Sequence, residues 1–527
     1  MIRLRALEII DFKNVEFGRV VLSNALSIED IGNGADVVGL YGQNGSGKTS
    51  FIQALSILKT LWSGGALDRS VRECIRTGQN CFRLRVEFFA AVGDDDPICD
   101  YISGIIEDVP EHIPYLAIYE VSVGSHSHHS PLVLSESLSC KDLSSDESMH
   151  EVFAWKVEEN GGNGEAEHSV SKNDSVIPKW VEDATEHWSF QLSDIAPTTR
   201  WQSLVAADRV EGSKLEATKN QSFQQGESFL FSTGLMSFSR GMLGDVDRTL
   251  SKAASSALTR VCMPTFLIAT SCRLFATKNM VVLPTVQQGV LALGYLPLAS
   301  HEGERGGYVD NIMLLDIESA KPIESSQVVE LERALNSVSE VLGALVPGLA
   351  VEVERRGEML GNDGERLVNI ELMSVRGGSR VPLRNESEGI KKVLSVISLL
   401  IDIHSNPATF VAIDEFDSGV FEYLLGEILQ TISEGGSGQL VFTAHNLRPL
   451  EVLSSNSIWF TTIKPDKRYV RATGVHGTNN LRKMYLRDVR LGRDDDDVYV
   501  PTSPLNIDSA LYDAGVVIRK MQRSLKG

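Results

Sequence analysis

A glycine-rich segment near the start of the chain constrains its fold more than any other feature. Residues 42–49 read GQNGSGKT and fit the phosphate-loop pattern GxxxxGK(S/T). The short apolar run 37–41 precedes this segment. Apolar residues follow it at helical spacing, namely Phe51, Leu55, Leu58 and Leu61. The order strand, loop, helix is the context that a phosphate loop requires, so the sequence predicts an α/β domain built around it.

The loop is predicted to hold the phosphates of a nucleotide. Its glycines let backbone N–H groups point inward around the β-phosphate, and Lys48 would reach the β- and γ-phosphates while Thr49 would ligate Mg²⁺. The residues expected to contact the nucleotide are Gly42, Gln43, Asn44, Gly45, Ser46, Gly47, Lys48, Thr49 and Ser50. A glycine-rich turn with an incidental lysine is the alternative, and the flanking strand and helix weigh against it.

A pair of acidic residues lies far along the chain, directly after an apolar run. Residues 409–413 read TFVAI, as expected for a buried strand, and Asp414 and Glu415 follow. Asp414 would hold the Mg²⁺ shell, and Glu415 would polarise the water that attacks the γ-phosphate. Two acids at an exposed strand end are the alternative, which the apolar run disfavours. Together the two motifs predict an ATPase that uses ATP and Mg²⁺.

A histidine follows the next predicted strand. His445 comes just after the strand-like residues 439–443, where an imidazole can contact the γ-phosphate. A histidine on its own would more often be structural, so this prediction depends on the two motifs above. We expect His445 to act with Lys48 and Glu415 in catalysis.

The composition limits the class of protein and its partners. The sequence has 527 residues, with 70 acidic and 50 basic side chains and a formal net charge of −20. This charge argues against a protein that coats DNA through its overall charge, but it does not exclude a local basic groove. The amino terminus lacks a signal peptide's apolar core, no apolar run of membrane-span length is uninterrupted, and the six cysteines form no CxxC pair. We therefore expect a cytoplasmic protein with reduced thiols and no membrane contact.

Local patterns predict the elements around these motifs. Residues 3–12 alternate as a strand does, and 81–160 read largely as antiparallel strands. The stretch 122–173 is rich in Ser, His, Gly and acidic residues and predicts long mobile loops. Ser326 could cap an amphipathic helix that ends at Pro347.

The remaining signals concern the middle and the end of the chain. Histidines within 125–129 and four aspartates at 494–497 could suggest metal sites, but surface loops are the better interpretation. Residues 508–525 read as an amphipathic helix with a basic end, suited to docking. Three regions are predicted: an N-terminal ATPase lobe over 1–205, an inserted subdomain over 206–325 and a C-terminal ATPase lobe over 326–527.

The order of the motifs carries a resemblance to a known family. The phosphate loop, NESEG at 385–389, VAIDEFDSG at 411–419 and FTAHN at 442–446 occur in the order of ABC-type ATPases. The residues of these motifs resemble those of the RecF/SMC/OLD-like group, and most of all those of the short OLD-like ATPases of bacterial anti-phage defence systems, which lack a TOPRIM domain. Residues 9–15 also resemble the first strand of that group. The resemblance covers about 1–90 and 326–460.

This resemblance implies a fold and an assembly. The fold would be an α/β RecF/SMC-like ABC ATPase head with two lobes, a mixed sheet, an antiparallel β arm, an inserted mainly helical subdomain and no long coiled coil. Two copies would close an ATP sandwich, giving a homodimer or a higher homo-oligomer. Ser387 and Gly389 would then contact the γ-phosphate of the partner's nucleotide, and Asp417 would lie in the loop that links the two sites.

Two details of the resemblance are incomplete. Lys13 and Asn14 would approach the nucleotide from the first strand, and a Mg²⁺-sensing glutamine is expected that the sequence does not identify. The common ABC signature reads LSGGQ, whereas residues 386–390 read ESEGI, which keeps only the serine and the second glycine. The contacts made across the sandwich are therefore less firmly implied than those within one chain.

The family also implies a biological role. We expect the sensor or scaffold of an anti-phage defence system that controls a separate effector, expected to be a nuclease, and a phage protein could be the trigger. DNA could be bound as well. The alternative is a RecF-like DNA-repair ATPase, and a third possibility is a self-contained nuclease that uses acidic residues of the insertion.

Overall fold

The fold is known from a computed structural model. It describes residues 1–25, 27, 30–31, 34–93, 112–125, 131–146, 148–156, 209–237, 239, 252–284, 295–299, 312–316, 319–361, 364–471, 481–491 and 503–524. The segments 126–130 and 494–497, for which surface loops were predicted, lie outside these residues.

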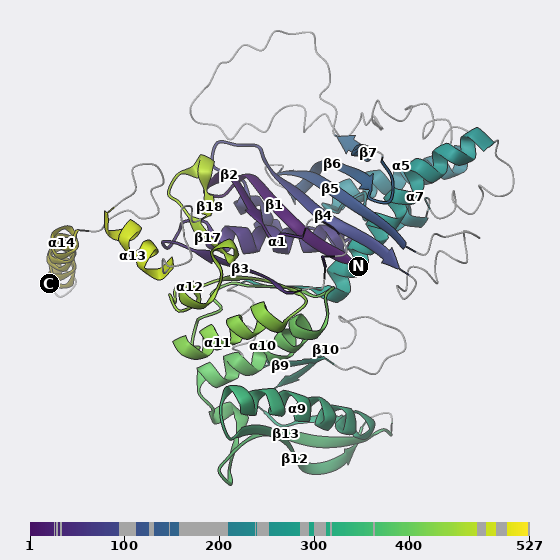
Figure 1. Ribbon diagram of the computed structural model, residues 1–527. Helices are drawn as coiled ribbons and strands as arrows, with labels where there is room; N and C mark the ends of the chain where they lie inside the picture. Colours follow the sequence, from purple (N-terminus) through teal and green to yellow (C-terminus); the bar gives the residue numbers. More distant parts are fainter. Residues whose placement is uncertain are drawn as a thin grey trace.

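A six-stranded mixed sheet lies at the centre of the molecule (Figure 1). In spatial order its strands are β18 (Tyr469–Arg471), β17 (Ile458–Thr461), β3 (Asp36–Tyr41), β16 (Gln439–Thr443), β15 (Phe410–Ile413) and β8 (Met280–Leu283). All neighbouring strands run parallel except β18, which is antiparallel to β17. The carboxyl ends of β3, β15 and β16 therefore meet at one edge of the sheet, where the chemistry predicted from the sequence comes together.

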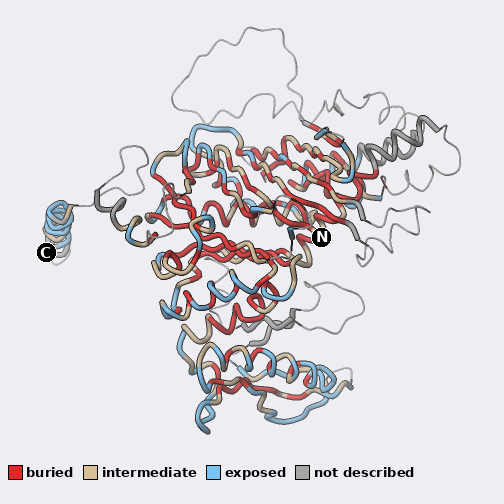
Figure 2. The backbone as a smooth tube through the Cα atoms, in the orientation of Figure 1, coloured by how far each residue is buried: buried red, intermediate tan, exposed pale blue. Residues whose placement is uncertain are grey.

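Both faces of this sheet are buried, so its strands are apolar on both sides (Figure 2). Because side chains alternate along a strand, Leu40 and Ala412 enter one hydrophobic core, whereas Val37 and Val411 enter the other. The short strand β15 is fully buried along its length. This double burial explains why residues 409–413 read as a continuous apolar run.

The first core lies between the central sheet and an antiparallel sheet. The order of that second sheet is β2 (Val15–Val21), β1 (Ile2–Phe12), β4 (Cys81–Gly93), β5 (His112–Ser125), β6 (Pro131–Asp142) and β7 (His150–Lys156). Helix α1 (Lys48–Trp62) packs between the two sheets, with Phe51, Leu55, Leu58 and Leu61 all fully buried. The antiparallel strands predicted over 81–160 are present in its described part.

The second core lies on the opposite face of the central sheet. It holds α10 (Glu388–Ser405), α11 (Glu422–Gly435) and α9 (Ser325–Leu345), the last of which packs on a smaller antiparallel sheet. That sheet has the order β11 (Lys321–Glu324), β13 (Arg366–Arg376), β12 (Leu349–Leu360), with β14 (Ser379–Pro382) also paired to β13. Helix α9 begins one residue before Ser326, and Glu324 stands at its cap position without a capping bond.

The middle of the chain contributes to the first core and the central sheet. Helix α5 (Arg209–Gln225) and helix α7 (Lys252–Leu274) contact strands of the antiparallel sheet, and β8 follows α7 to join the edge of the central sheet. Strands β9 (Tyr295–Ala299) and β10 (Ile312–Asp316) form an antiparallel pair. The boundaries predicted at 205 and 325 remain a prediction.

The C-terminal part adds short elements and two helices. They are α12 (Pro449–Val452), α13 (Leu481–Leu491) and α14 (Pro504–Ser524). Along the whole described chain, short helical turns also occur at Arg69–Cys74, Phe275–Asn279, Leu383–Asn385, Ser455–Ser457 and Pro465–Lys467. Among the described residues, no helix combines the length and the apolar character that crossing a membrane requires.

The predicted fold class is confirmed. The two lobes, the mixed sheet and the antiparallel arm are present, and the described chain contains no long coiled coil. Strands β6 and β7 lie within 81–160, which was predicted to be largely antiparallel strands. Of the stretch 122–173, in which long loops were predicted, residues 126–130, 147 and 157–173 lie outside the described residues. In β6 serines alternate with the buried residues Glu136, Leu138 and Cys140, so the serines occupy the less buried face of the strand.

Candidate functional site

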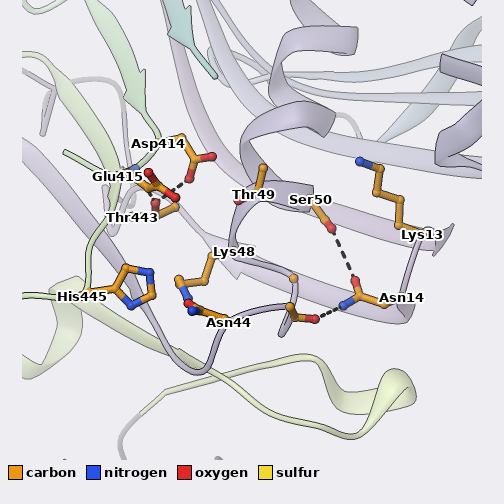
Figure 3. A pocket seen from close by; sticks show the side chains of 12 residues that line it. Lys13, Asn14, Asn44, Lys48, Thr49, Ser50, Asp414, Glu415, Thr443 and His445 are labelled. Carbon is orange, nitrogen blue, oxygen red and sulfur yellow. Dashed lines mark hydrogen bonds between the residues drawn. The ribbon is translucent and has the colours of Figure 1, made fainter. Parts of the chain in front are cut away.

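A cavity of about 320 Å³ lies at the carboxyl edge of the central sheet (Figure 3). Four chain segments line it: the turn between β1 and β2, the loop before α1, and the residues that follow β15 and β16. The lining residues are Lys13, Asn14, Asn44, Gly45, Gly47, Lys48, Thr49, Ser50, Asp414, Glu415, Thr443 and His445. Motifs that lie far apart in sequence therefore share one cavity.

The glycine-rich loop enters this cavity as a phosphate-binding loop does. Gly45 and Gly47 have φ angles of 76° and 102°, which other residues rarely adopt. Gly47 is the cap residue of α1, and no side chain caps that helix. The N-terminus of α1 therefore offers backbone N–H groups and its positive dipole end to an anion.

Lys48 bridges the two ends of the loop. Its Nζ donates to the carbonyl oxygens of Gly42 at 2.7 Å and Gln43 at 3.1 Å. Burial lowers the pKa of Lys48, and the nearby carboxylates of Asp414, Glu415 and Asp417 act in the opposite direction. A bound phosphate would add negative charge beside this amine and favour its protonated form.

The two acidic residues after β15 are held by Thr443 at the end of β16. The hydroxyl of Thr443 donates to Asp414 Oδ1 at 2.5 Å and accepts from the backbone N–H of Glu415 at 2.8 Å. Asp414 is fully buried, and Glu415 has a φ of 47°, an uncommon conformation for a residue with a side chain. This turn directs both carboxylates into the cavity (Figure 3).

Asp417 fixes the chain around His445. One carboxylate oxygen of Asp417 accepts from the backbone N–H groups of His445 at 2.8 Å and Asn446 at 2.7 Å. Asp417 itself does not line the cavity, whereas His445 does. The segment after β15 thus sets the position of the segment after β16.

The turn between β1 and β2 closes one side of the loop. Asn14 Nδ2 donates to the carbonyl oxygen of Gly45, and Ser50 Oγ donates to Asn14 Oδ1 at 3.4 Å. Lys13 adopts a φ of 51° at this turn and lines the same cavity. The structure therefore brings Lys13 and Asn14 to the loop, and their contact with a nucleotide stays a prediction.

The sequence analysis missed a group of residues behind the loop, on β17, β18 and the link between them. Tyr469 Oη donates to the carbonyl oxygen of Gly47 at 2.8 Å, and Arg468 donates to the carbonyl oxygen of Asn14. The hydroxyl of Thr461 is hydrogen-bonded to Ser46 Oγ, and a Cβ on Gly42 would lie 1.8 Å from it. Their distance in sequence from the loop left no local signal for this role.

Several predicted site residues do not line the cavity. Gly42, Gln43 and Ser46 support the loop from behind, through the contacts with Thr461 and Lys48 given above.

Ser387 caps α10 by accepting from Ile390 N at 3.3 Å. Gly389 packs so closely against the linking loop that a Cβ would lie 2.3 Å from the carbonyl oxygen of Gly419. Ser387 and Gly389 do not line the cavity of their own chain. Their expected contact with a γ-phosphate stays a prediction.

The donor set suits Mg²⁺ held together with a nucleotide. Thr49 supplies a hydroxyl and Asp414 a carboxylate, both in the cavity lining. Mg²⁺ prefers oxygen ligands and is usually bound by one or two protein groups plus phosphates and water. The described residues contain no cluster of three or more His, Cys, Asp or Glu side chains that could hold a metal alone.

The expected glutamine is not placed by the structure. The carbonyl oxygen of Leu283, at the end of β8, accepts from the backbone N–H of Asp414 at 3.0 Å. Gln287 and Gln288 follow β8 in the sequence but lie outside the described residues.

Comparisons with known proteins give a similarity of fold. Neither the protein-family models nor the curated proteins gave a match. Among solved structures, the chain is similar to the SmcHead bound to the C-winged helix domain of ScpA, at 12% identity over 89% of this chain and 97% of that one, with a TM-score of 0.37. It is also similar to the SMC head domain from Thermotoga maritima, at 12% identity over 89% and 99% of the two chains, with a TM-score of 0.33. Values this low say nothing of the ligand, reaction or partners of this chain.

Proposed function

We propose that this chain is an ABC-type ATPase that converts ATP and water to ADP and phosphate. The observation that supports this most directly is the convergence of Lys48, Thr49, Asp414, Glu415 and His445 on one cavity at the N-terminus of α1. A loop of positive-φ glycines, a buried carboxylate and a second carboxylate beside it are the parts that phosphoryl transfer to water needs.

Each side chain has a proposed task. Lys48 turns from the carbonyl oxygens of Gly42 and Gln43 to the β- and γ-phosphates, and Thr49 with Asp414 holds Mg²⁺. The metal supplies charge neutralisation at the phosphate oxygens when bound. Glu415 orients the attacking water and accepts its proton, and His445 contacts the γ-phosphate.

The active form is proposed to be a homodimer or a larger homo-oligomer closed by the nucleotide. Ser387 and Gly389 lie at the start of α10, outside the cavity of their own chain, and an incomplete site of this kind can be completed by a second copy. ATP would hold the two copies together, and hydrolysis would release them.

The proposed biological role rests on the resemblance to short OLD-like ATPases. In this role the chain is a cytoplasmic sensor or scaffold of an anti-phage defence system. ATP binding holds the closed assembly, and a phage trigger or hydrolysis releases or activates a separate effector, expected to be a nuclease.

The first test of this role is a phage-plaque assay. The native locus with its neighbouring genes is placed in a sensitive host, as wild type and as Lys48→Ala, and plaques are counted over a broad phage panel. Protection that the variant loses supports an ATP-dependent defence component. Equal protection by both versions contradicts it.

The RecF-like DNA-repair alternative is separated by a second measurement. It requires that DNA stimulates ATP turnover and that DNA binding weakens steeply as salt rises, because phosphate contacts release counterions. Turnover that is unchanged by single- and double-stranded DNA contradicts the repair role and leaves the defence role standing.

A further inference from the structure

The C-terminal helix α14 lies apart from the rest of the molecule (Figures 1 and 2). It carries large apolar side chains that are exposed. The side-chain exposures of Ile507, Leu511 and Ile518 are 50%, 69% and 55%. An isolated amphipathic helix gains little stability from its own hydrogen bonds, so most helices depend on packing of their apolar face. Nothing in the described part of the chain covers this face in Figure 1.

The apolar residues of α14 follow a heptad spacing. Ile507, Leu511, Ala514 and Ile518 are separated by four, three and four positions, and Met521 continues the pattern in the sequence. These residues share one narrow stripe of an α-helix, which is the seam that a two-stranded coiled coil buries. Leu505, Tyr512, Val516 and Val517 lie outside this stripe. The helix has 21 residues, which gives it three heptads.

The charges of α14 are unevenly distributed along it. Asp508 lies near its start and Asp513 near its middle, whereas the sequence places Arg519, Lys520 and Arg523 near its end. A parallel pair of identical helices would set the three basic residues of one copy beside those of the other. An antiparallel pair separates the two basic ends and sets each of them beside the end that carries Asp508, which favours it electrostatically.

We propose that α14 pairs in antiparallel orientation with α14 of a second copy of this chain. The heptad stripe fixes the register, in which Ile507 faces Ile518 of the other copy and Leu511 faces Ala514 of the other copy. A twofold axis relates the two helices, so each of these two contacts occurs twice and the pair has four apolar layers. This interface needs no nucleotide and does not depend on the proposed ATPase function. It would keep two copies together while the nucleotide interfaces open and close.

The test measures self-association of the full chain without nucleotide. Sedimentation of the Lys48→Ala chain in EDTA is followed over a range of protein concentrations, so that an ATP sandwich cannot form. A dimer is expected. Leu511→Glu should raise its dissociation constant by about 100-fold or more, because each of the two helices then places a glutamate in the apolar seam. Ser509→Glu, on the opposite side of α14, is the matched control and should leave the dimer intact.

Other outcomes overturn the proposal. A monomer at every concentration contradicts it, even if that monomer binds anionic lipid vesicles through α14. A dimer that Leu511→Glu leaves unchanged contradicts it as well, because the association then uses another surface.

The orientation is tested by disulfide crosslinking. Chains carrying Ile507→Cys and chains carrying Ile518→Cys are oxidised separately and as a mixture, with the parent chain as background. Antiparallel pairing predicts a crosslinked dimer in the mixture and none with Ile507→Cys alone. A crosslinked dimer of Ile507→Cys alone indicates parallel pairing and overturns the proposed orientation.

Discussion

The hydroxyl of Thr443 donates a hydrogen bond of 2.5 Å to the buried carboxylate of Asp414. The same hydroxyl accepts from the backbone of Glu415, so one side chain orients both acidic residues of the site. Groups that orient a metal ligand or a base affect activity although they touch neither substrate nor metal. Thr443 is therefore a positioning residue of the proposed reaction.

Thr443→Val should reduce ATP turnover by about 10- to 100-fold and weaken the dependence on Mg²⁺. Valine keeps the shape of threonine but leaves Asp414 and the N–H of Glu415 without this partner. Turnover is measured over a Mg²⁺ titration. Thr431→Val, on the exposed face of α11, is the control. If both variants titrate as wild type does, Thr443 does not position the site.

Glu415→Gln should lower turnover by at least about 100-fold, because the amide cannot accept the proton of the attacking water. ATP binding should persist, since no loop residue changes, and the nucleotide-bound assembly should accumulate. Single-turnover hydrolysis and ATP-dependent sedimentation test the two parts. Wild-type turnover by this variant would remove Glu415 from the role of base.

The backbone at Glu415 allows a separate stability measurement. A φ of 47° is costly for a residue with a Cβ and not for glycine. Glu415→Gly should therefore be more stable than Glu415→Ala by about 1 kcal/mol in urea unfolding, while both lack turnover. Equal stabilities would show that the surrounding structure imposes no strain here.

The sequence predicted those parts of the site whose signal is local. The phosphate loop and Asp414–Glu415 each combine a motif with an adjacent apolar strand, and both strands occupy the central sheet. Partners brought close only by the fold could not be found in this way. The bond from Tyr469 to Gly47 spans 422 positions of the chain, and a tyrosine in a short strand carries no sign of it.

Strand β6 shows how a buried polar residue can mislead sequence reasoning. Glu136 lies on the buried face of this strand, although a carboxylate usually marks the exposed face. Its oxygens accept from Tyr119, Trp155, Ser228 and two backbone N–H groups, which offsets the cost of burying it. These donors come from three separate segments, namely β5, β7 and residues 228–230, so only the folded chain reveals why a glutamate is tolerated there.

Lys48→Met should abolish nucleotide binding and remove a pH-dependent cost from the folded protein. Burial lowers the pKa of Lys48, so its charged form is less stable in the folded than in the unfolded chain. This penalty is complete below the folded pKa and disappears as pH rises towards the ordinary value of 10.5. In urea unfolding from pH 7 to 10.5, the stability of Lys48→Met relative to the parent chain should fall as the pH rises. Lys483→Ala, exposed on α13, controls for ATP binding. A difference that stays constant with pH would contradict the assigned cause.

Tyr469→Phe should raise the KM for ATP with a smaller effect on kcat. The variant keeps the ring that packs against Phe51 but loses the bond to Gly47, whose position sets the phosphate loop. The free energy of unfolding should fall by about 1 kcal/mol. Tyr119→Phe also removes a buried hydrogen bond, to Glu136, and should lower stability without changing the KM. An unchanged KM for Tyr469→Phe would limit its role to stability.

Gln439→Leu should destabilise the joint between the two large sheets. The side chain of Gln439 on β16 accepts from Leu4 N at 2.9 Å and donates to Leu4 O at 2.8 Å. Leu4 lies in the part of β1 that does not pair with β2, so the Gln439 amide makes the hydrogen bonds that a neighbouring strand would otherwise make. Leucine has a similar volume but leaves both buried backbone groups unpaired, at a cost of about 2 kcal/mol or more.

Urea unfolding measures this loss, with Gln430→Leu on the exposed face of α11 as the control that should change stability by less than about 0.5 kcal/mol. Because Gln439 lies at the start of β16 and Thr443 at its end, a loosened joint should also lower ATP turnover before the chain unfolds. Full turnover up to the unfolding transition would mean that the other contacts between the two sheets, such as the ion pair of Arg3 with Asp36, are enough to hold the site in place.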